Sequence, residues 1–475
     1  MPTNPIQIYN SLSGKKELFE PLKPPKVNIY TCGVTVYDDC HIGHARSLYI
    51  FDVMRRYLEY KKYKVNFVRN ITDIDDKIIN RARQENKGEP LIETTKSVTD
   101  KYIQSYYKDL ESLGIKKADF EPRATENIPE MVEYIKLLID KGYAYVTNTG
   151  VYFSVRKFQN YGQLSHQSID QMLTGVRKEA DETKNDPLDF ALWKLSKPDE
   201  PKWQSPWGEG RPGWHIECSV MSQKFLKTET LDIHAGGLDL VFPHHENEIA
   251  QAEALTGKPF AKYWIHHGLL TINGHKMSKS LGNFVTVSQF LEKYEVDILK
   301  LFFLTAHYKS SIDYTQEKIE IAKKNKEEID RFFSQYLFGK KDKLSKEDKE
   351  AIDRIVENFN LVMSDDFNTP RALAEVFGAV NLGSNYVVQD KVSALNYLRE
   401  KISDLLDILG ISPEKEIDEK TKKQLEKLLK ERQEARERKD YKRADQIREE
   451  IRNKGFVISD TGSSFSITSH RINER

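Results

Sequence analysis

The segment between residues 27 and 68 constrains the fold most, because it predicts a strand, a loop, a helix and a second strand in succession. The two strands are the short apolar runs Val27–Cys32 and Val65–Val68, and the helix between them begins at about Gly43. A strand–helix–strand unit of this kind is a right-handed parallel crossover. It predicts a Rossmann-like α/β sheet, without the glycine-rich loop of a dinucleotide site. The apolar side chains of the helix share one face, at Leu48, Phe51, Met54 and Leu58.

Two histidines follow the first predicted strand, at the edge where ligands bind in open α/β sheets. They are His41 and His44, and two lysines with the same spacing, Lys276 and Lys279, follow downstream in the run Lys-Met-Ser-Lys-Ser. Residues three apart in a helical turn share one face. When a carboxylate attacks the α-phosphate of ATP, positioned donors and cations stabilise the charge that builds on the phosphate oxygens. The two motifs therefore predict an ATP site in which the histidines hold the α-phosphate and the lysines hold the leaving pyrophosphate.

The composition is that of an ordinary globular chain, and its 475 residues suggest about three domains. No apolar run is long enough to span a membrane, and the first residues lack the features of a secretory signal. Three cysteines in a chain of this size argue for a reducing compartment, so we expect a cytoplasmic protein with no membrane partner. The 73 basic and 73 acidic side chains balance, so any RNA contact must use local basic faces.

The order of patterns predicts a catalytic sheet that is split by an insertion and followed by helices. A hairpin is indicated from Tyr143 to Val155, and the polar stretch Leu164–Trp207 predicts partly irregular structure. The sheet resumes at Leu231–His234. The expected parts are a Rossmann-like catalytic domain (1–120 and 205–310), an inserted connective segment (121–204), a helical bundle (311–410) and a small C-terminal domain with a charged helical hairpin and a strand pair (411–475).

The histidine and lysine motifs, together with four further motifs, resemble those of a known family. The His41–His44 and Lys276–Ser280 motifs resemble the two signatures of class I aminoacyl-tRNA synthetases, and the surrounding sequence resembles cysteinyl-tRNA synthetases from about Ile8 to about Gly455. The motifs that carry this resemblance are Tyr30–Asp38, Arg69–Lys77, Gly213–Ser219 and Phe242–Glu248.

The resemblance implies the activity and its partners. It implies a monomeric ligase that joins L-cysteine to the 3′-terminal adenosine of tRNA(Cys) through a cysteinyl-adenylate, with ATP and Mg²⁺ as co-substrate. It also implies that residues 411–475 bind the anticodon. The mostly uncharged tail Ile458–Thr468 departs from the basic tail that is common in the family, so the tail residues that contact the anticodon stay undefined.

A metal site is indicated only weakly by spacing. Cys32 and Cys218 stand at predicted strand and helix ends, and His244 and Glu248 are four apart on a helix expected from about Pro243. His245 and Glu248 are nearly as well spaced, so spacing does not choose between the histidines. Without a CxxC pair, spacing favours buried cysteines and a polar helix start over zinc. The resemblance, by contrast, implies one zinc ion held by Cys32, Cys218, His244 and Glu248.

A zinc ion at this position would explain how cysteine is selected. Zinc prefers a thiolate ligand, and serine differs from cysteine by one atom that an apolar pocket rejects poorly. On this hypothesis zinc selects the substrate and activates no water, and no editing domain is needed.

The resemblance also implies roles for residues that have ordinary structural alternatives. It implies that Gly33 and Thr72 contact the amino acid and that Trp214 covers its side chain; the alternatives for the last two are a helix cap and a core tryptophan. The ATP site would comprise Gly237, Asp239, Lys276, Ser278 and Lys279 together with His41 and His44, with Asp239 on the ribose.

Three other functions compete with this interpretation. A relative of the family ligates cysteine to an amino-sugar acceptor, but it lacks a counterpart of residues 411–475. Small nucleotidylyltransferases share the histidine signature but are much shorter. A non-catalytic RNA-binding protein would not need the intact histidines and lysines.

Overall fold

The computed structural model describes residues 4–175, 183–278, 282–338, 342–413, 418–461 and 464–469. The chain forms two compact units. The first comprises residues 1–293 and 308–313, and the second comprises residues 294–307 and 314–475. No helix of the described residues is long and apolar enough to cross a membrane.

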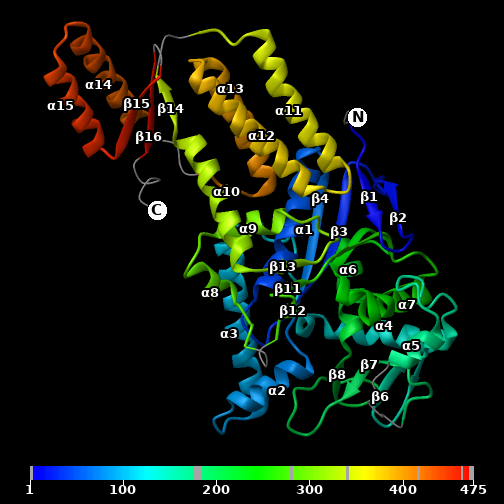
Figure 1. Cartoon of the computed structure of the whole chain (residues 1–475). Helices are drawn as coiled ribbons and strands as arrows, with labels where there is room; N and C mark the ends of the chain where they lie inside the picture. The colour runs from blue at the N-terminus through cyan, green and yellow to red at the C-terminus, as the bar shows by residue number, and fades with distance from the viewer. Residues whose placement is uncertain are drawn as a thin grey trace. The chain divides into compact units, whose positions relative to one another are not determined.

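The first unit is built on a four-stranded parallel sheet of order β10-β9-β3-β4. Its strands β3 and β4 lie side by side in Figure 1. Helix α1 (Ile42–Tyr60) connects β3 to the parallel strand β4, so the predicted crossover and the Rossmann-like fold class are confirmed. The chain leaves β3 toward one edge and β9 toward the other, so these two central strands form the switch point at which ligands bind. The strands are β3 (Lys26–Thr35), β4 (Lys64–Thr72), β9 (Leu231–Gly237) and β10 (Ala261–His267).

Two local features shape the ligand edge of this sheet. The pairing of β3 with β4 shifts register between Thr31 and Val34, so Cys32 and Gly33 lie in an irregularity of the strand. On the other side of the switch point, β9 ends at Gly237 and runs into two short helical turns, η3 (Leu238–Leu240) and η4 (Val241–His245). Both strands therefore deliver irregular backbone to the same edge of the sheet.

Helices and several smaller sheets complete the first unit. The predicted hairpin near 143–155 is confirmed, because β5 and β6 pair antiparallel. The strand β7 (Phe190–Leu195) pairs with both β6 and β8. The sequence did not indicate this strand, because its short apolar run is flanked by polar residues. The remaining elements are β1 (Gln7–Asn10), β2 (Lys15–Leu18), α2 (Asp76–Glu85), α3 (Leu91–Ser112), η1 (Ala124–Asn127), α4 (Ile128–Asp140), β5 (Ala144–Val146), β6 (Gly150–Phe153), η2 (Val155–Lys157), α5 (Ile169–Gly175), β8 (Gly210–Pro212), α6 (Trp214–Leu226), α7 (Glu246–Thr256), β11 (Leu270–Ile272), β12 (His275–Lys276) and α8 (Val287–Leu291), with β13 (Ile312–Tyr314) at the boundary between the units.

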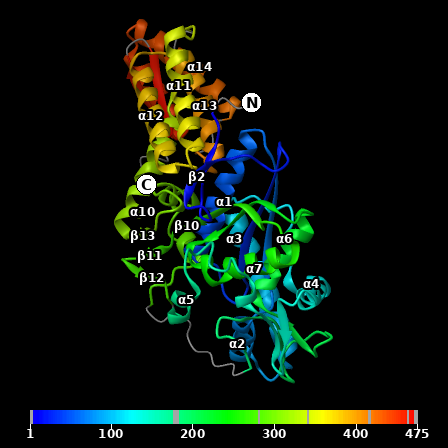
Figure 2. The same ribbon diagram turned by 90° about the vertical axis from the view of Figure 1, so that its right-hand side faces the viewer.

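The second unit is mainly helical, as predicted. Helices α11, α12 and α13 run side by side (Figure 2), and the helical hairpin α14–α15 packs on a three-stranded antiparallel sheet of order β14-β16-β15. Apolar side chains of both hairpin helices and of the sheet form one buried cluster, which includes Leu425, Leu429, Ile447 and Ile467. The elements are α9 (Val296–Leu304), α10 (Gln316–Ser334), β14 (Tyr336–Phe338), α11 (Lys346–Ser364), α12 (Thr369–Val388), α13 (Val392–Leu409), α14 (Glu419–Glu437), α15 (Tyr441–Asn453), β15 (Phe456–Thr461) and β16 (Ser464–Ser469).

Candidate active site and metal centre

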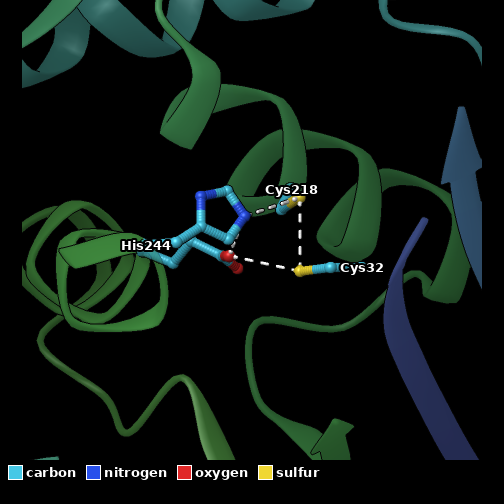
Figure 3. Close-up of side chains that lie close together, drawn as sticks. Cys32, Cys218 and His244 are labelled. Carbon is cyan, nitrogen blue, oxygen red and sulfur yellow. Dashed lines mark hydrogen bonds and ion pairs between the residues drawn. The ribbon is translucent and has the colours of Figure 1, made fainter. Parts of the chain in front are cut away.

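Four side chains from four elements meet at the switch point of the sheet (Figure 3). Cys32 comes from β3, Cys218 from α6, His244 from η4 and Glu248 from α7, and their ligand atoms all lie within 4.8 Å of one another. The two sulfurs are 3.7 Å apart, and Cys218 Sγ is 3.6 Å from His244 Nε2. Ligand atoms of a tetrahedral zinc site lie roughly 3.3–3.8 Å apart. The donor types and these two separations therefore fit zinc, while His244 Nε2 and Glu248 Oε1 lie closer together, at 2.9 Å, as an ion pair.

The two histidines between which spacing did not choose, His244 and His245, have different partners in the structure. His244 lies in η4 just before α7, which begins at Glu246 and not at the expected Pro243. It belongs to the cluster that contains both cysteines, whereas His245 belongs to a second cluster with Cys32, His234 and Glu248. The Nε2 atom of His245 is 3.2 Å from Cys32 Sγ, so both histidines reach the same cysteine.

The charges of the cluster are strongly coupled. Burial raises the pKa of the Cys218 thiol, but hydrogen bonds with Cys32 and His244 outweigh this effect and lower it to about 6. Burial likewise opposes the charged form of His244, yet the Glu248 carboxylate and Cys218 raise its pKa to about 10. The His234 and His244 imidazoles hold the pKa of Glu248 well below its usual range despite burial. A site that binds a proton this firmly between anionic ligands is suited to a metal cation, whose binding displaces the proton.

Further histidines, buried or half-buried, surround the candidate ligands, and the sequence analysis assigned a possible role only to His245 among them. His215 Nδ1 is 2.8 Å from His244 Nδ1, and His234 Nε2 is 2.7 Å from Glu248 Oε2. His245 Nδ1 is 2.8 Å from His266 Nε2. These contacts orient the ligand side chains from outside the cluster. For His215, His234 and His266 the sequence signal was the density of histidines between residues 215 and 267.

The two signature histidines share one geometry at the start of α1. His41 is the N-cap, and its Nδ1 accepts hydrogen bonds from the backbone N–H groups of Gly43 and His44. His44 Nδ1 in turn accepts from the His41 N–H, and the two rings stack with centroids 3.7 Å apart. Because each Nδ1 accepts, each Nε2 carries the proton. Burial lowers the pKa of His41 to about 4 and that of His44 to about 3, so both rings are neutral hydrogen-bond donors at pH 7.

The lysine motif approaches this helix start. Lys276 is exposed at the end of β12 and not in a helical turn, and the Ser278 N–H donates to Asn283 Oδ1 at 2.8 Å. The chain beyond the motif is tied to the histidine motif, because the Ile42 N–H donates to the Val285 carbonyl at 3.1 Å. Lys279 lies outside the described residues.

The predicted amino-acid contacts lie beside the metal cluster. Gly33 has no room for a side chain, because a Cβ there would stand 1.6 Å from the Asn70 carbonyl oxygen. Thr72 is buried, and its hydroxyl donates to Glu217 Oε2 at 2.6 Å. Trp214 is 37% exposed and stacks on the His244 ring at a centroid distance of 4.0 Å. Trp214 is therefore a cover of the metal cluster and not a core residue.

The predicted ribose contact occupies the same edge. Asp239 is exposed in η3, directly after β9. A Cβ on Gly237 would stand 2.4 Å from Asp239 Oδ1, so glycine is required for this conformation of the carboxylate. Burial lowers the pKa of both His41 and His267, and the Asp239 charge opposes this lowering without outweighing it.

Comparison with known proteins agrees with this geometry. The family model for the class I (C) tRNA synthetase catalytic domain matches residues 18–324, the DALR domain matches 358–412, and the cysteinyl-tRNA ligase anticodon-binding domain matches 418–464. The chain is 49% identical to a cysteine–tRNA ligase of Persephonella marina, covering 96% of this chain and 98% of that one. It is 48% identical to the enzyme of Aquifex aeolicus, covering 96% and 97%. A methionyl-tRNA synthetase of Mycobacterium tuberculosis solved with methionyl-adenylate shares the fold, with a TM-score of 0.59, 14% identity and coverage of 81% and 91%.

The parallel sheet, the two signature motifs and the matched catalytic domain define a class I aminoacyl-tRNA synthetase. Within that class, the chain belongs to the cysteine–tRNA ligase family.

Proposed function

We propose that this chain ligates L-cysteine to the 3′-terminal adenosine of tRNA(Cys) in two steps. In the first, a carboxylate oxygen of cysteine attacks the α-phosphorus of ATP, and the bond to the β-phosphate breaks to release pyrophosphate. In the second, a terminal ribose hydroxyl attacks the carbonyl carbon and AMP leaves. The observation that carries this function is the meeting of the thiolate-type metal cluster and the His41–His44 pair at one edge of one sheet.

The ATP site would use neutral donors on the α-phosphate. The Nε2–H groups of His41 and His44 donate to the oxygens on which charge develops. Lys276, Ser278 and Lys279 would hold the pyrophosphate with its Mg²⁺, and Gly237 would let Asp239 reach the ribose hydroxyls.

The cysteine site would use the cluster of Cys32, Cys218, His244 and Glu248 to hold one zinc ion. Bound there, zinc supplies a ligand position that prefers a thiolate to a hydroxyl. Gly33 and Thr72 would contact the remainder of the amino acid, and Trp214 would close the pocket from the His244 side. The three free thiols of the described residues fit a reducing compartment, and we place the protein in the cytoplasm as a monomer.

The tRNA contact would involve a basic face of α14. Lys420, Lys423 and Lys427 line one surface hollow with Gln424. The first half of α14 carries four lysines and two glutamates, so this part of the helix has a net positive charge. A local basic face of this kind is suited to binding phosphates. The proposed domains are the catalytic halves 1–120 and 205–310, the insertion 121–204, the bundle 311–410 and the anticodon-binding domain 411–475.

The decisive experiment is cysteine-dependent ATP–pyrophosphate exchange, with serine as control and zinc measured in the same sample. We expect exchange with cysteine, none with serine, and about one zinc per chain. Adding tRNA(Cys) or an amino-sugar acceptor to the same sample then decides the second step. Absence of exchange from a folded, zinc-loaded sample would refute the proposed activity.

A further inference from the structure

A buried carboxylate beside the metal cluster has no cationic partner in the described part of the chain. Glu217 lies in the first turn of α6 and is 1% exposed. Its Oε2 accepts from the Thr72 hydroxyl at 2.6 Å, but its Oε1 is buried without a hydrogen-bond partner. Buried carboxylates are normally paired, because an unpartnered buried charge is costly. The free oxygen therefore indicates a ligand that carries a positive charge or several donors.

Hydrogen bonds around Thr72 leave one acceptor position for the same ligand. The single Thr72 hydroxyl proton is donated to Glu217, and Asn70 Nδ2 donates to the same hydroxyl at 3.2 Å. The orientation of Asn70 is fixed, because its Oδ1 accepts from the Gly33 N–H at 2.8 Å. Thr72 Oγ1 is then left with a lone pair and no proton to offer. Together, Glu217 and Thr72 present acceptors only.

These acceptors lie next to the metal cluster. Asn70 connects the two sites, since its Oδ1 is 3.8 Å from Cys218 Sγ while its Nδ2 is 3.2 Å from Thr72 Oγ1. Glu217 also precedes Cys218 directly in α6. In cysteine only three bonds separate sulfur from nitrogen, so a substrate whose sulfur sits at the cluster has its α-ammonium on a neighbouring position.

We propose that Glu217 recognises the α-ammonium group of the cysteine substrate, through its free Oε1 and through Thr72, which it holds as an acceptor. Glu217 has this role only if the proposed activation of cysteine holds. The zinc cluster selects the thiol and Glu217 selects the amine, so the pocket favours a thiol that has an ammonium beside it.

Two truncated substrates separate this role from a structural one. Cysteamine has the thiol and the ammonium but no carboxylate, whereas 3-mercaptopropionate has the thiol and the carboxylate but no ammonium. Each is used as an inhibitor of cysteine-dependent ATP–pyrophosphate exchange by the wild type and by Glu217→Gln. We expect Glu217→Gln to raise the KM for cysteine and the inhibition constant of cysteamine about ten- to a hundredfold, the range for a lost charged hydrogen bond. The inhibition constant of 3-mercaptopropionate and the KM for ATP should change less than about threefold.

Glu246→Gln is the matched control. Glu246 is another fully buried glutamate, but its oxygens accept from the N–H groups of Gly162, Leu164 and Ser165. This variant should lose stability without changing the ratio of the two inhibition constants. If Glu217→Gln fails to fold, Thr72→Val removes the hydroxyl instead and should show the same selective loss. Equal changes for both inhibitors, or no change for cysteamine, would overturn the role of Glu217 while wild-type exchange left the proposed function intact.

Discussion

Glu248→Gln tests the metal centre with the smallest change of shape. Glu248 is fully buried, with Oε1 2.9 Å from His244 Nε2 and Oε2 2.7 Å from His234 Nε2. An amide keeps an acceptor for only one of these histidines and turns its NH₂ group toward the other, and it removes the negative charge that both contact. Breaking a buried charged pair costs about 3–5 kcal/mol.

The same loss should appear in zinc affinity. The substitution removes one of the four proposed donors, and one of the three that are anionic. We therefore expect the Kd for zinc to rise roughly a hundred- to a thousandfold, which corresponds to about 3–4 kcal/mol. Zinc competition against a chromophoric chelator measures this directly, and cysteine-dependent exchange should fall in parallel. Glu246→Gln, two residues earlier and outside the cluster, should keep the wild-type zinc affinity. A Glu248→Gln protein that binds zinc within about threefold of the wild type would refute the assignment of this carboxylate as a ligand.

Three further outcomes are expected. The pKa of His44 is lowered by burial to about 3, below the usual value near 6.5, so its ring stays neutral as pH falls from 8 to 5.5. The value of kcat/KM for ATP should therefore show no protonation limb near pH 6.5. A limb that disappears in the His44→Asn variant would contradict this prediction. Arg46 is fully buried and donates to the carbonyls of Gly268, Leu269 and Ser310. Arg46→Met should therefore lower the free energy of unfolding, measured by denaturant titration, by about 4 kcal/mol or more. A loss below about 1 kcal/mol would be inconsistent with those hydrogen bonds. Replacing Lys423 by Glu should weaken tRNA binding and reduce its salt dependence in filter-binding assays while pyrophosphate exchange is unchanged; an unaltered salt dependence would remove α14 from the interface.

The parallel sheet could be predicted because its signals are local. The apolar runs that became β3 and β4, and the one-sided helix between them, each specify their own structure, and the handedness of the crossover leaves little choice of topology. The strand β7 was missed because its apolar run is short and lies among polar residues; its pairing with β6 and β8 is a tertiary event that spacing does not encode.

The metal cluster shows a different limit of the sequence. Cys32 and Cys218 are 186 positions apart, and the spacing of His244 and Glu248 is matched by His245. The folded chain gives the two histidines different partners: His244 groups with both cysteines and Glu248, whereas His245 groups with Cys32, His234 and Glu248. The choice of His244 as a ligand follows from the resemblance to a known family and stays a prediction.

The histidines behind the cluster explain how a dication could be held in so buried a place. Burial lowers the pKa of His215, His245 and His266, so these rings remain neutral at pH 7. Neutral imidazoles can orient the ligands through hydrogen bonds without adding positive charge that would compete with a metal. Had lysines filled these positions, their ammonium groups would have neutralised the ligand carboxylate instead of supporting it. Under the proposed function, the charge of the cluster side chains is therefore available to a metal ion, and the unpartnered oxygen of Glu217 is available to the substrate.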